Sequence, residues 1–487
     1  MYRNSRERRG TVLWAVALAQ FVVALDMAVV NVALPAVRAD LGFAPVDLAW
    51  VVHVYALTFG GLLLLGGRAA DLYGRRRLFV GGLAVFGAAS LAGGLAQAPW
   101  QLVAARAAQG AGAAALAPAA LALLTVTFPE GPARVRALGV WSGVNAVGGA
   151  SGVLVGGLLT EYAGWRWVML VNVPVVLGAL AAGVAGMPGG AAGGHRGRLD
   201  VPGALLATTG TGLLVLGVVR TDREGWTSPV TVTSLAAAAL LLAAFVTVER
   251  RVRQPLVRPG LFRNRWISGA NAFVLLVAAG QFSAFYFVSL YLQQVLHLSA
   301  AATGAAFLPF SLGTVAATVV ATRLGSRRSP RAALLAGGLA GATGLGWFAL
   351  ISPTGGFLTD VLGPSLLTAA GIGLCQAPVA VAATTGVSAA EAGTASGILN
   401  SSRQLGGCLG VAALATVAAR HTGTDTGEAA LSGGYALGLG VGAALLLAAV
   451  ALAAFVLPGD RPRPSAHESD RTPPSAGTGT RLEGTRS

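Results

Sequence analysis

An acidic residue, Asp26, lies in the middle of the first long apolar run of the chain, within LDMAVVNVALP (25–35). Hydrocarbon cannot solvate a charge, so an ionisable residue at that depth is a functional candidate by default. A basic residue, Arg106, lies inside another apolar run, LVAARAAQGAG. Burial favours a neutral acid, whereas a neighbouring guanidinium favours the carboxylate. The pair is therefore suited to binding and releasing a proton, and a permanently satisfied structural ion pair is the alternative.

The surroundings of these two residues follow from the composition. The chain has 487 residues, of which 54% are hydrophobic and 11% charged, and its basic residues are all arginines. Runs of about 20 apolar residues, the length that crosses a bilayer, recur throughout. We therefore predict an all-α polytopic membrane protein with fourteen transmembrane helices. The predicted spans are 12–36, 48–67, 78–97, 100–127, 135–160, 165–187, 201–219, 230–248, 266–296, 302–322, 332–351, 358–383, 391–419 and 433–457.

The arginines predict the orientation of these spans. They concentrate in the N-terminal segment, in the even-numbered connections and in the C-terminal tail. Under the positive-inside rule this bias places both termini in the cytoplasm. We expect a multi-pass protein of the inner, or plasma, membrane.

A repeated motif indicates the domain organisation. GRAADLYGRRRL (67–78) has a weaker counterpart in TRLGSRRSPR (322–331), which is typical of two structural repeats. The predicted units are an N-terminal six-helix bundle (1–187), an inserted helix pair with cytoplasmic linkers (188–265), a C-terminal six-helix bundle (266–457) and a disordered cytoplasmic tail (458–487).

The predicted spans place Asp26 and Arg106 at the same depth. At about 1.5 Å per residue, Asp26 lies roughly 22 Å above the cytoplasmic start of its helix. Arg106 lies roughly 9 Å below the outer start of the fourth helix by the same measure. In a hydrocarbon core about 30 Å thick these heights coincide. We expect the two side chains to face each other in one half of the protein.

Two further sets of residues suggest conformational control. A carboxylate within a basic turn after the second helix suits an ion-pair latch, formed by Asp71, Gly74, Arg75, Arg76 and Arg77. Glycines at four-residue spacing in the fifth helix let another helix approach closely, and either serve a gating seam or provide ordinary tight packing. These gating candidates are Gly148, Gly152, Gly156 and Gly157.

Polar side chains within the predicted helices are candidates for lining a substrate cavity, although each could equally be an interhelical hydrogen-bonding group. They are Asn31, His53, Tyr55, Asn145, Gln281, Tyr286, Tyr291, Gln293, Asn400, Arg403 and Gln404. The sequence has no P-loop pattern, no His and Cys cluster at metal-binding spacing and no GxSxG nucleophile motif. We therefore expect no enzymatic activity, cofactor or metal site. We also expect no nucleic-acid partner, because most of the arginines lie in short connections between apolar runs.

Several of these segments, in order, resemble one family. The chain is similar to the fourteen-helix drug:proton antiporter branch of the major facilitator superfamily. LDMAVVNVALP resembles its helix 1 motif, GRAADLYGRRRL its loop 2–3 motif and LVAARAAQGAGAA its helix 4 motif. WRWVMLVNVP (165–174), RLDVPGALLATTG (198–210) and EAGTASGILNSSRQLGG (391–407) are also typical of that branch. The resemblance implies the superfamily's fold, with the helices arranged as 6+2+6.

The resemblance also implies a function. It implies proton-coupled multidrug efflux of a hydrophobic or amphipathic small molecule, such as an antibiotic, by alternating access and as a monomer. Asp26 and Arg106 would then take part in coupling. One departure is that Val153 follows Gly152 where the antiporter motif of helix 5 has a Gly-Pro pair. A proton-coupled importer and an exporter of an endogenous metabolite or lipid stay as alternatives. A channel or a nontransporting receptor is disfavoured, because the polar residues are sparse and no long segment lies outside the spans.

Overall fold

Helices make up almost all of the structure, a computed structural model that describes residues 2–44, 47–128, 132–186, 200–252, 255, 259–324, 329–386, 392–423 and 427–458. The first six predicted spans contain α1 (Tyr2–Leu41), α2 (Trp50–Tyr73), α3 (Arg75–Gly94), α4 (Pro99–Thr127), α5 (Pro132–Tyr162), α6 (Arg166–Leu170) and α7 (Asn172–Gly186). The next two contain α8 (Val201–Glu224) and α9 (Pro229–Arg251). The remainder contain η1 (Pro259–Arg263), α10 (Arg265–Gln294), α11 (Ala300–Ala306), α12 (Leu308–Leu324), α13 (Pro330–Phe348), η2 (Phe357–Leu362), α14 (Gly363–Thr384), α15 (Ala392–Thr422) and α16 (Glu428–Val456).

Each of the fourteen predicted spans coincides with helix, although some are interrupted. The sixth is split into α6 and α7, the tenth into α11 and α12, and the twelfth starts as the π-helix η2. Within the described residues, twelve helical segments are long and apolar enough to cross a membrane. The two other predicted spans correspond to α13 and α15. The polar stretch from Asn400 to Gln404 lies in the middle of α15.

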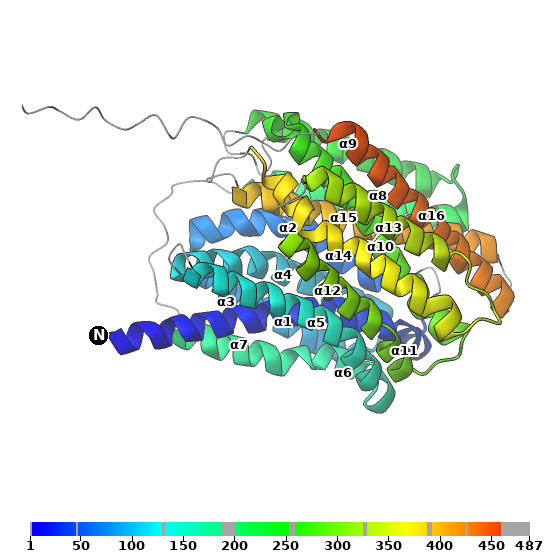
Figure 1. Ribbon diagram of the computed structural model, residues 1–487, viewed down its shortest axis with the longest axis horizontal. Helices are drawn as coiled ribbons and strands as arrows, with labels where there is room; N and C mark the ends of the chain where they lie inside the picture. The colour runs from blue at the N-terminus through cyan, green and yellow to red at the C-terminus, as the bar shows by residue number, and fades with distance from the viewer. Residues whose placement is uncertain are drawn as a thin grey trace, which may run out of the picture.

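The helix pairings of the first six spans recur in the last six. The contacts of α1 with α5, α2 with α4, and α3 with α4 correspond to those of α10 with α15, α12 with α14, and α13 with α14. Likewise, α7 packs on α1 and α3 as α16 packs on α10 and α13. Figure 1 shows the long helices running side by side through one bundle. The two sets of six meet where α2 contacts α15, where α5 contacts α11 and α12, and where α1 contacts α10.

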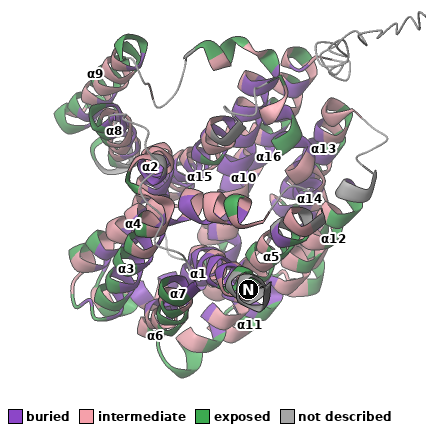
Figure 2. Cartoon of the chain, turned by 90° about the vertical axis from the view of Figure 1, so that its left-hand side faces the viewer, coloured by how far each residue is buried: buried purple, intermediate pink, exposed green. Residues whose placement is uncertain are grey.

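The helices α8 and α9 form a pair at the side of this bundle. They pack on each other, and α8 also contacts α2 and α15 (Figure 2). Leu57 of α2, Val215 of α8 and Cys408 of α15 belong to one small buried cluster. The pair therefore covers one of the seams between the two sets of six.

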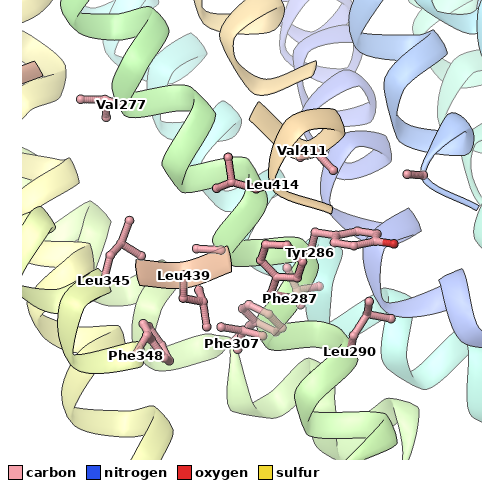
Figure 3. Close-up of a cluster of buried hydrophobic side chains, with 14 of the residues drawn as sticks. Val277, Tyr286, Phe287, Leu290, Phe307, Leu345, Phe348, Val411, Leu414 and Leu439 are labelled. Carbon is pink, nitrogen blue, oxygen red and sulfur yellow. The ribbon is translucent and has the colours of Figure 1, made fainter. Parts of the chain in front are cut away.

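The largest apolar core joins both sets of six at one end of α1. It includes Val29 to Val37 of α1 together with many residues of α10. Figure 3 shows its centre, where Phe287 and Phe307 lie between Tyr286 and Leu290 on one side and Leu345 and Phe348 on the other. Outward-facing side chains are also apolar, for example Leu240 and Phe455, which are 71% and 81% exposed. Exposed apolar surface of this kind fits contact with lipid.

The glycines of α5 bring this helix against α1. Backbone or Cβ atoms of α1 would lie 2.8 Å or less from a Cβ added at Gly148, Gly152 or Gly156. These three glycines therefore pack within the first set of six. Gly157, by contrast, faces Ala300 of α11 in the second set. In α15, Gly406 and Gly410 approach the backbone of α10 in the same manner.

The close approach of α5 to α1 predicts that glycine-to-alanine substitutions at Gly152 and Gly149 have different effects on thermal stability. A Cβ at Gly152 would lie 2.8 Å from Ala28 Cβ and from Leu25 O, whereas one at Gly149 would meet nothing within 4 Å. Gly152→Ala should lower the thermal unfolding temperature of the purified protein, because overpacking costs about 1–3 kcal/mol. Gly149→Ala should leave it unchanged or raise it, since alanine favours helix by up to about 1 kcal/mol. Equal shifts for the two variants would contradict this packing.

Candidate functional site

Asp26 and Arg106 form an ion pair in the interior of the first set of six helices. Arg106 Nη1 on α4 donates to Asp26 Oδ2 on α1 at 2.6 Å. The Asp26 side chain has no exposed surface and that of Arg106 is 2% exposed. The structure therefore brings together the two charges that sequence spacing places at equal depth. Two buried charges tolerate each other only when their remaining hydrogen-bonding capacity is also satisfied.

The second carboxylate oxygen of Asp26 is satisfied by two amides. Gln109 Nε2 on α4 donates to Asp26 Oδ1 at 3.1 Å, and Asn172 Nδ2 on α7 donates to the same atom at 2.8 Å. Gln109 Nε2 also donates to Ser90 Oγ on α3, at 2.8 Å. The network therefore connects four helices. Our sequence predictions did not include Gln109, Ser90 or Asn172, although Gln109 lies one helical turn after Arg106 and Asn172 lies within WRWVMLVNVP.

Arg106 has further partners that fix its orientation. Its Nε donates to the Val51 carbonyl of α2 at 3.0 Å, and its Nη1 also donates to Gln109 Oε1 at 2.9 Å. The guanidinium carbon lies 4.2 Å from the centroid of the Tyr55 ring, in the range of a cation–π interaction. Tyr55 therefore contributes its ring face to the network, while its buried hydroxyl has no hydrogen-bond partner among the described residues. We define the residues Asp26, Tyr55, Ser90, Arg106, Gln109 and Asn172 as the Asp26 network.

The predicted latch residues lie at the junction of α2 and α3. Gly74 has φ of 98°, a conformation that favours glycine, and it separates the two helices. Arg76 Nη2 donates to the Val184 carbonyl near the end of α7 at 3.0 Å, and Arg77 is exposed. The side chain of Asp71 lies outside the described part of the chain. In the second set, Arg331 Nη2 donates to the Ala454 carbonyl near the end of α16, at 2.5 Å.

Two of the predicted cavity residues, Gln281 and Arg403, line adjoining pockets among α10 and α12 to α15. The first pocket is lined by Phe273, Val274, Val277, Ala278, Gln281, Ile372, Cys375, Gln376, Val379 and Arg403. The second is lined by Gln281, Ala284, Phe285, Val288, Phe307, Phe310, Phe348, Ser365 and Thr368. Gln281 lines both, and Arg403 Nη2 donates to Gln376 Oε1 at 3.0 Å.

The other predicted cavity residues lie elsewhere. Gln293 of α10 donates to the Val32 carbonyl of α1, and the carbonyl of Asn31 accepts from Ser289 Oγ, each at 3.2 Å. Tyr291 OH donates to the Ser352 carbonyl at 2.8 Å. Asn145 accepts from Gln20 Nε2 at 2.6 Å.

Two of the remaining four candidates, His53 and Gln404, lie at the seam between α2 and α15. His53 is fully buried and neither ring nitrogen has a hydrogen-bond partner among the described residues. Gln404 Nε2 lies 3.8 Å from Met27 Sδ. Asn400 is exposed and donates to the Ser396 carbonyl of its own helix, while Tyr286 is buried at 6% exposure.

Comparisons with known proteins agree with this architecture. The model of the Major Facilitator Superfamily matches residues 16–411. The cephamycin export protein of Amycolatopsis lactamdurans is 46% identical over 452 residues, covering 92% of each chain. A puromycin resistance protein of Streptomyces alboniger is 44% identical, covering 85% of this chain and 83% of that one. A lincomycin resistance protein of Streptomyces lincolnensis is 38% identical, covering 87% of each.

Solved structures show the same fold. A bacterial homologue of the human lysosomal transporter Spinster, in an inward-facing and unoccupied conformation, matches with a TM-score of 0.63 at 16% identity, covering 92% of this chain and 96% of that one. A mutant of the nucleoside transporter NupG matches with a TM-score of 0.62 at 12% identity, covering 91% of this chain and 99% of that one.

The chain therefore belongs to the major facilitator superfamily. It is a membrane-embedded transporter of small molecules rather than an enzyme, and a multi-pass protein of the plasma membrane.

The burial of the ion pair predicts a rescue of stability by a second substitution. Arg106→Met should destabilise the protein by about 3–5 kcal/mol, because it leaves the buried Asp26 carboxylate without its counter-charge. Asp26→Leu combined with Arg106→Met should recover most of the lost thermal stability, since no unpaired charge then remains. Thermal unfolding of the detergent-purified variants measures both. A double variant no more stable than Arg106→Met would contradict a mutually dependent pair.

Proposed function

We propose that this protein exports a hydrophobic or amphipathic small molecule, an antibiotic, across the bacterial plasma membrane in exchange for protons. The support is that its relatives include proteins named for cephamycin export and for puromycin and lincomycin resistance. The proposed architecture is fourteen transmembrane helices arranged as 6+2+6, with units 1–187, 188–265 and 266–457, both termini in the cytoplasm and a monomeric state. Residues 459–487 of the predicted tail lie outside the described residues.

The observation that carries proton coupling is the Asp26 network. In the observed geometry Asp26 accepts three hydrogen bonds, from Arg106, Gln109 and Asn172, an arrangement that suits the ionised carboxylate. Protonation would remove the charge that holds Arg106 and would leave a buried guanidinium without its counter-ion. The packing of α1 against α4 and α7 thus depends on the proton. Gly152 of α5 contacts Leu25 and Ala28 of α1, the neighbours of Asp26. A change in the packing of α1 is therefore transmitted to α5, which contacts the second set of six.

Contacts between the two sets of six suggest that the outer side of the transporter is closed in this structure. Glu161 Oε2 of α5 accepts from the Ala301 amide at the start of α11, at 2.8 Å. Ser289 and Gln293 of α10 donate to carbonyls of α1 that lie beyond Asp26 from the N-terminus. In the proposed orientation these contacts lie toward the outer face. Outward release of cargo would require them to separate, as alternating access demands.

The energy available from protons is adequate for such a cycle. Moving one elementary charge across about 100 mV contributes about 2.3 kcal/mol. A proton that reaches Asp26 from outside and leaves to the cytoplasm would supply this in each cycle. An importing symporter is the rival function, and the direction of transport decides between them. Cells that express the protein should accumulate less cephamycin, puromycin or lincomycin, and greater accumulation would contradict export.

Asp26→Asn tests the coupling directly, with Asp40→Asn as the matched control. Asp40 is an acid near the outer end of the same helix whose carboxylate pairs with Arg166 at 2.6 Å, both being 40% or more exposed. In proteoliposomes with an imposed pH gradient, Asp26→Asn should abolish gradient-driven transport of whichever of the three antibiotics the wild type transports, whereas Asp40→Asn should retain it. Equilibrium binding, measured on the same preparations, shows whether the variant still takes its cargo. Proton-driven transport by Asp26→Asn would overturn the coupling role.

A further inference from the structure

We propose that the adjoining pockets of the second set form one binding site for an amphipathic anion, in which Arg403 receives the anionic group and a ring of phenylalanines holds the apolar body. This inference rests on the proposed transport function and names the chemical class of its cargo.

The charge of Arg403 is the first argument. Unlike Arg106, which has Asp26 as its counter-ion, Arg403 has no carboxylate at ion-pair distance among the described residues. Its hydrogen-bond partner there is the neutral Gln376 Oε1. The walls around it are mainly apolar, including Val277 and Ile372. A guanidinium in such surroundings is costly until an anion neutralises it, and its planar array of donors fits a carboxylate or phosphate.

The shape of the site is the second argument. Gln281 lines both pockets, so the two adjoin at this residue of α10, with Arg403 beside one and the phenylalanines beside the other. The far end contains Phe285, whose ring stacks on Phe307 at 5.3 Å between centroids and meets Phe310 edge-on at 4.9 Å. An aromatic body would match these rings.

The location of the site is the third argument. Its lining comes from α10, from α12 to α15 and from Phe307 between α11 and α12, whereas the Asp26 network comes from α1, α2, α3, α4 and α7. The proton and the anion therefore have separate sites in separate sets of six helices. Coupling between them must be conformational, through the contacts between the two sets. Exchange of an anion moving out for a proton moving in would also draw on the membrane potential twice, because both movements carry positive charge inward.

A pair of probes that differ only in charge tests this assignment. Tritiated 1-naphthylacetate is an aromatic anion, and 1-naphthylacetamide is its neutral analogue. Binding of the acid to the purified full-length protein is measured by scintillation proximity, and binding of the amide by competition. The wild type should favour the acid, and Arg403→Gln should weaken acid binding about tenfold or more, as loss of a charge-assisted hydrogen bond predicts, while amide binding changes little. Arg403→Lys should restore most of the preference for the acid.

Two further variants separate recognition from folding. Arg420→Gln, in the last turn of α15 and outside both pockets, should leave both affinities unchanged. Phe310→Ala should weaken binding of the acid and of the amide alike, because it removes one aromatic ring from the apolar end of the site. Thermal unfolding of each variant shows whether it is folded.

The outcomes are distinguishable from those of the proposed function. Equal binding of the acid and amide by the folded wild type, or equal losses of both in Arg403→Gln, would overturn the anion site, even where Asp26-dependent antiport is present. The predicted charge selectivity would support the site, even where a pH gradient drives no transport.

Discussion

The buried ion pair between Asp26 and Arg106 is the interaction on which the rest of the structure depends. A carboxylate and a guanidinium in an apolar interior persist only if each satisfies the other and if their remaining hydrogen-bonding groups are also paired. Gln109, Asn172 and the Val51 carbonyl complete that set. These partners come from α2, α4 and α7, so the Asp26 carboxylate and its counter-ion Arg106 fix the positions of the helices around α1. Whatever changes that charge changes the packing of the first set of six.

The two sets of six share their helix pairings but not their chemistry. Gly148 brings α5 onto Phe21 of α1, and Gly406 brings α15 onto Leu275 of α10. The first set adds a matched ion pair, whereas the second adds an arginine, Arg403, whose described partner is a neutral amide. In the proposed mechanism each set carries one of the two exchanged species, and α5, α2 and α1 transmit the change between them.

Sequence predicted the elements better than their contacts. Bilayer-length apolar runs predicted helix at all fourteen positions, because the length of an apolar run is a strong signal. The equal depths of Asp26 and Arg106 in their helices were enough to predict that the two side chains face each other. The breaks between α6 and α7 and between α11 and α12 were not predicted, although Pro174 and Pro309 lie in the first turns of α7 and α12 and a proline interrupts a continuous helix. Gln109 and Asn172 were missed because a lone amide in a helix resembles many that bond only to their own backbone, as Asn400 does. The glycines Gly148, Gly152 and Gly156 were predicted to serve either a gating seam or ordinary tight packing, and their contacts lie on α1, in the same set. The four-residue spacing of glycines identifies a helix face without side chains, but it does not identify the helix that packs on that face.

The central claim is that cargo and proton bind this protein in exchange, with Asp26 as the proton acceptor. Its most direct measurement is proton uptake or release when a transported antibiotic is added to purified protein in weakly buffered solution, followed with a pH indicator. Binding linkage requires that a cargo which lowers the affinity for protons also releases them. The wild type should release protons in proportion to the cargo bound, and Asp26→Asn should bind cargo without releasing any. Equal release from both proteins, or cargo binding by the wild type with no release over the pH range of transport, would contradict the claim.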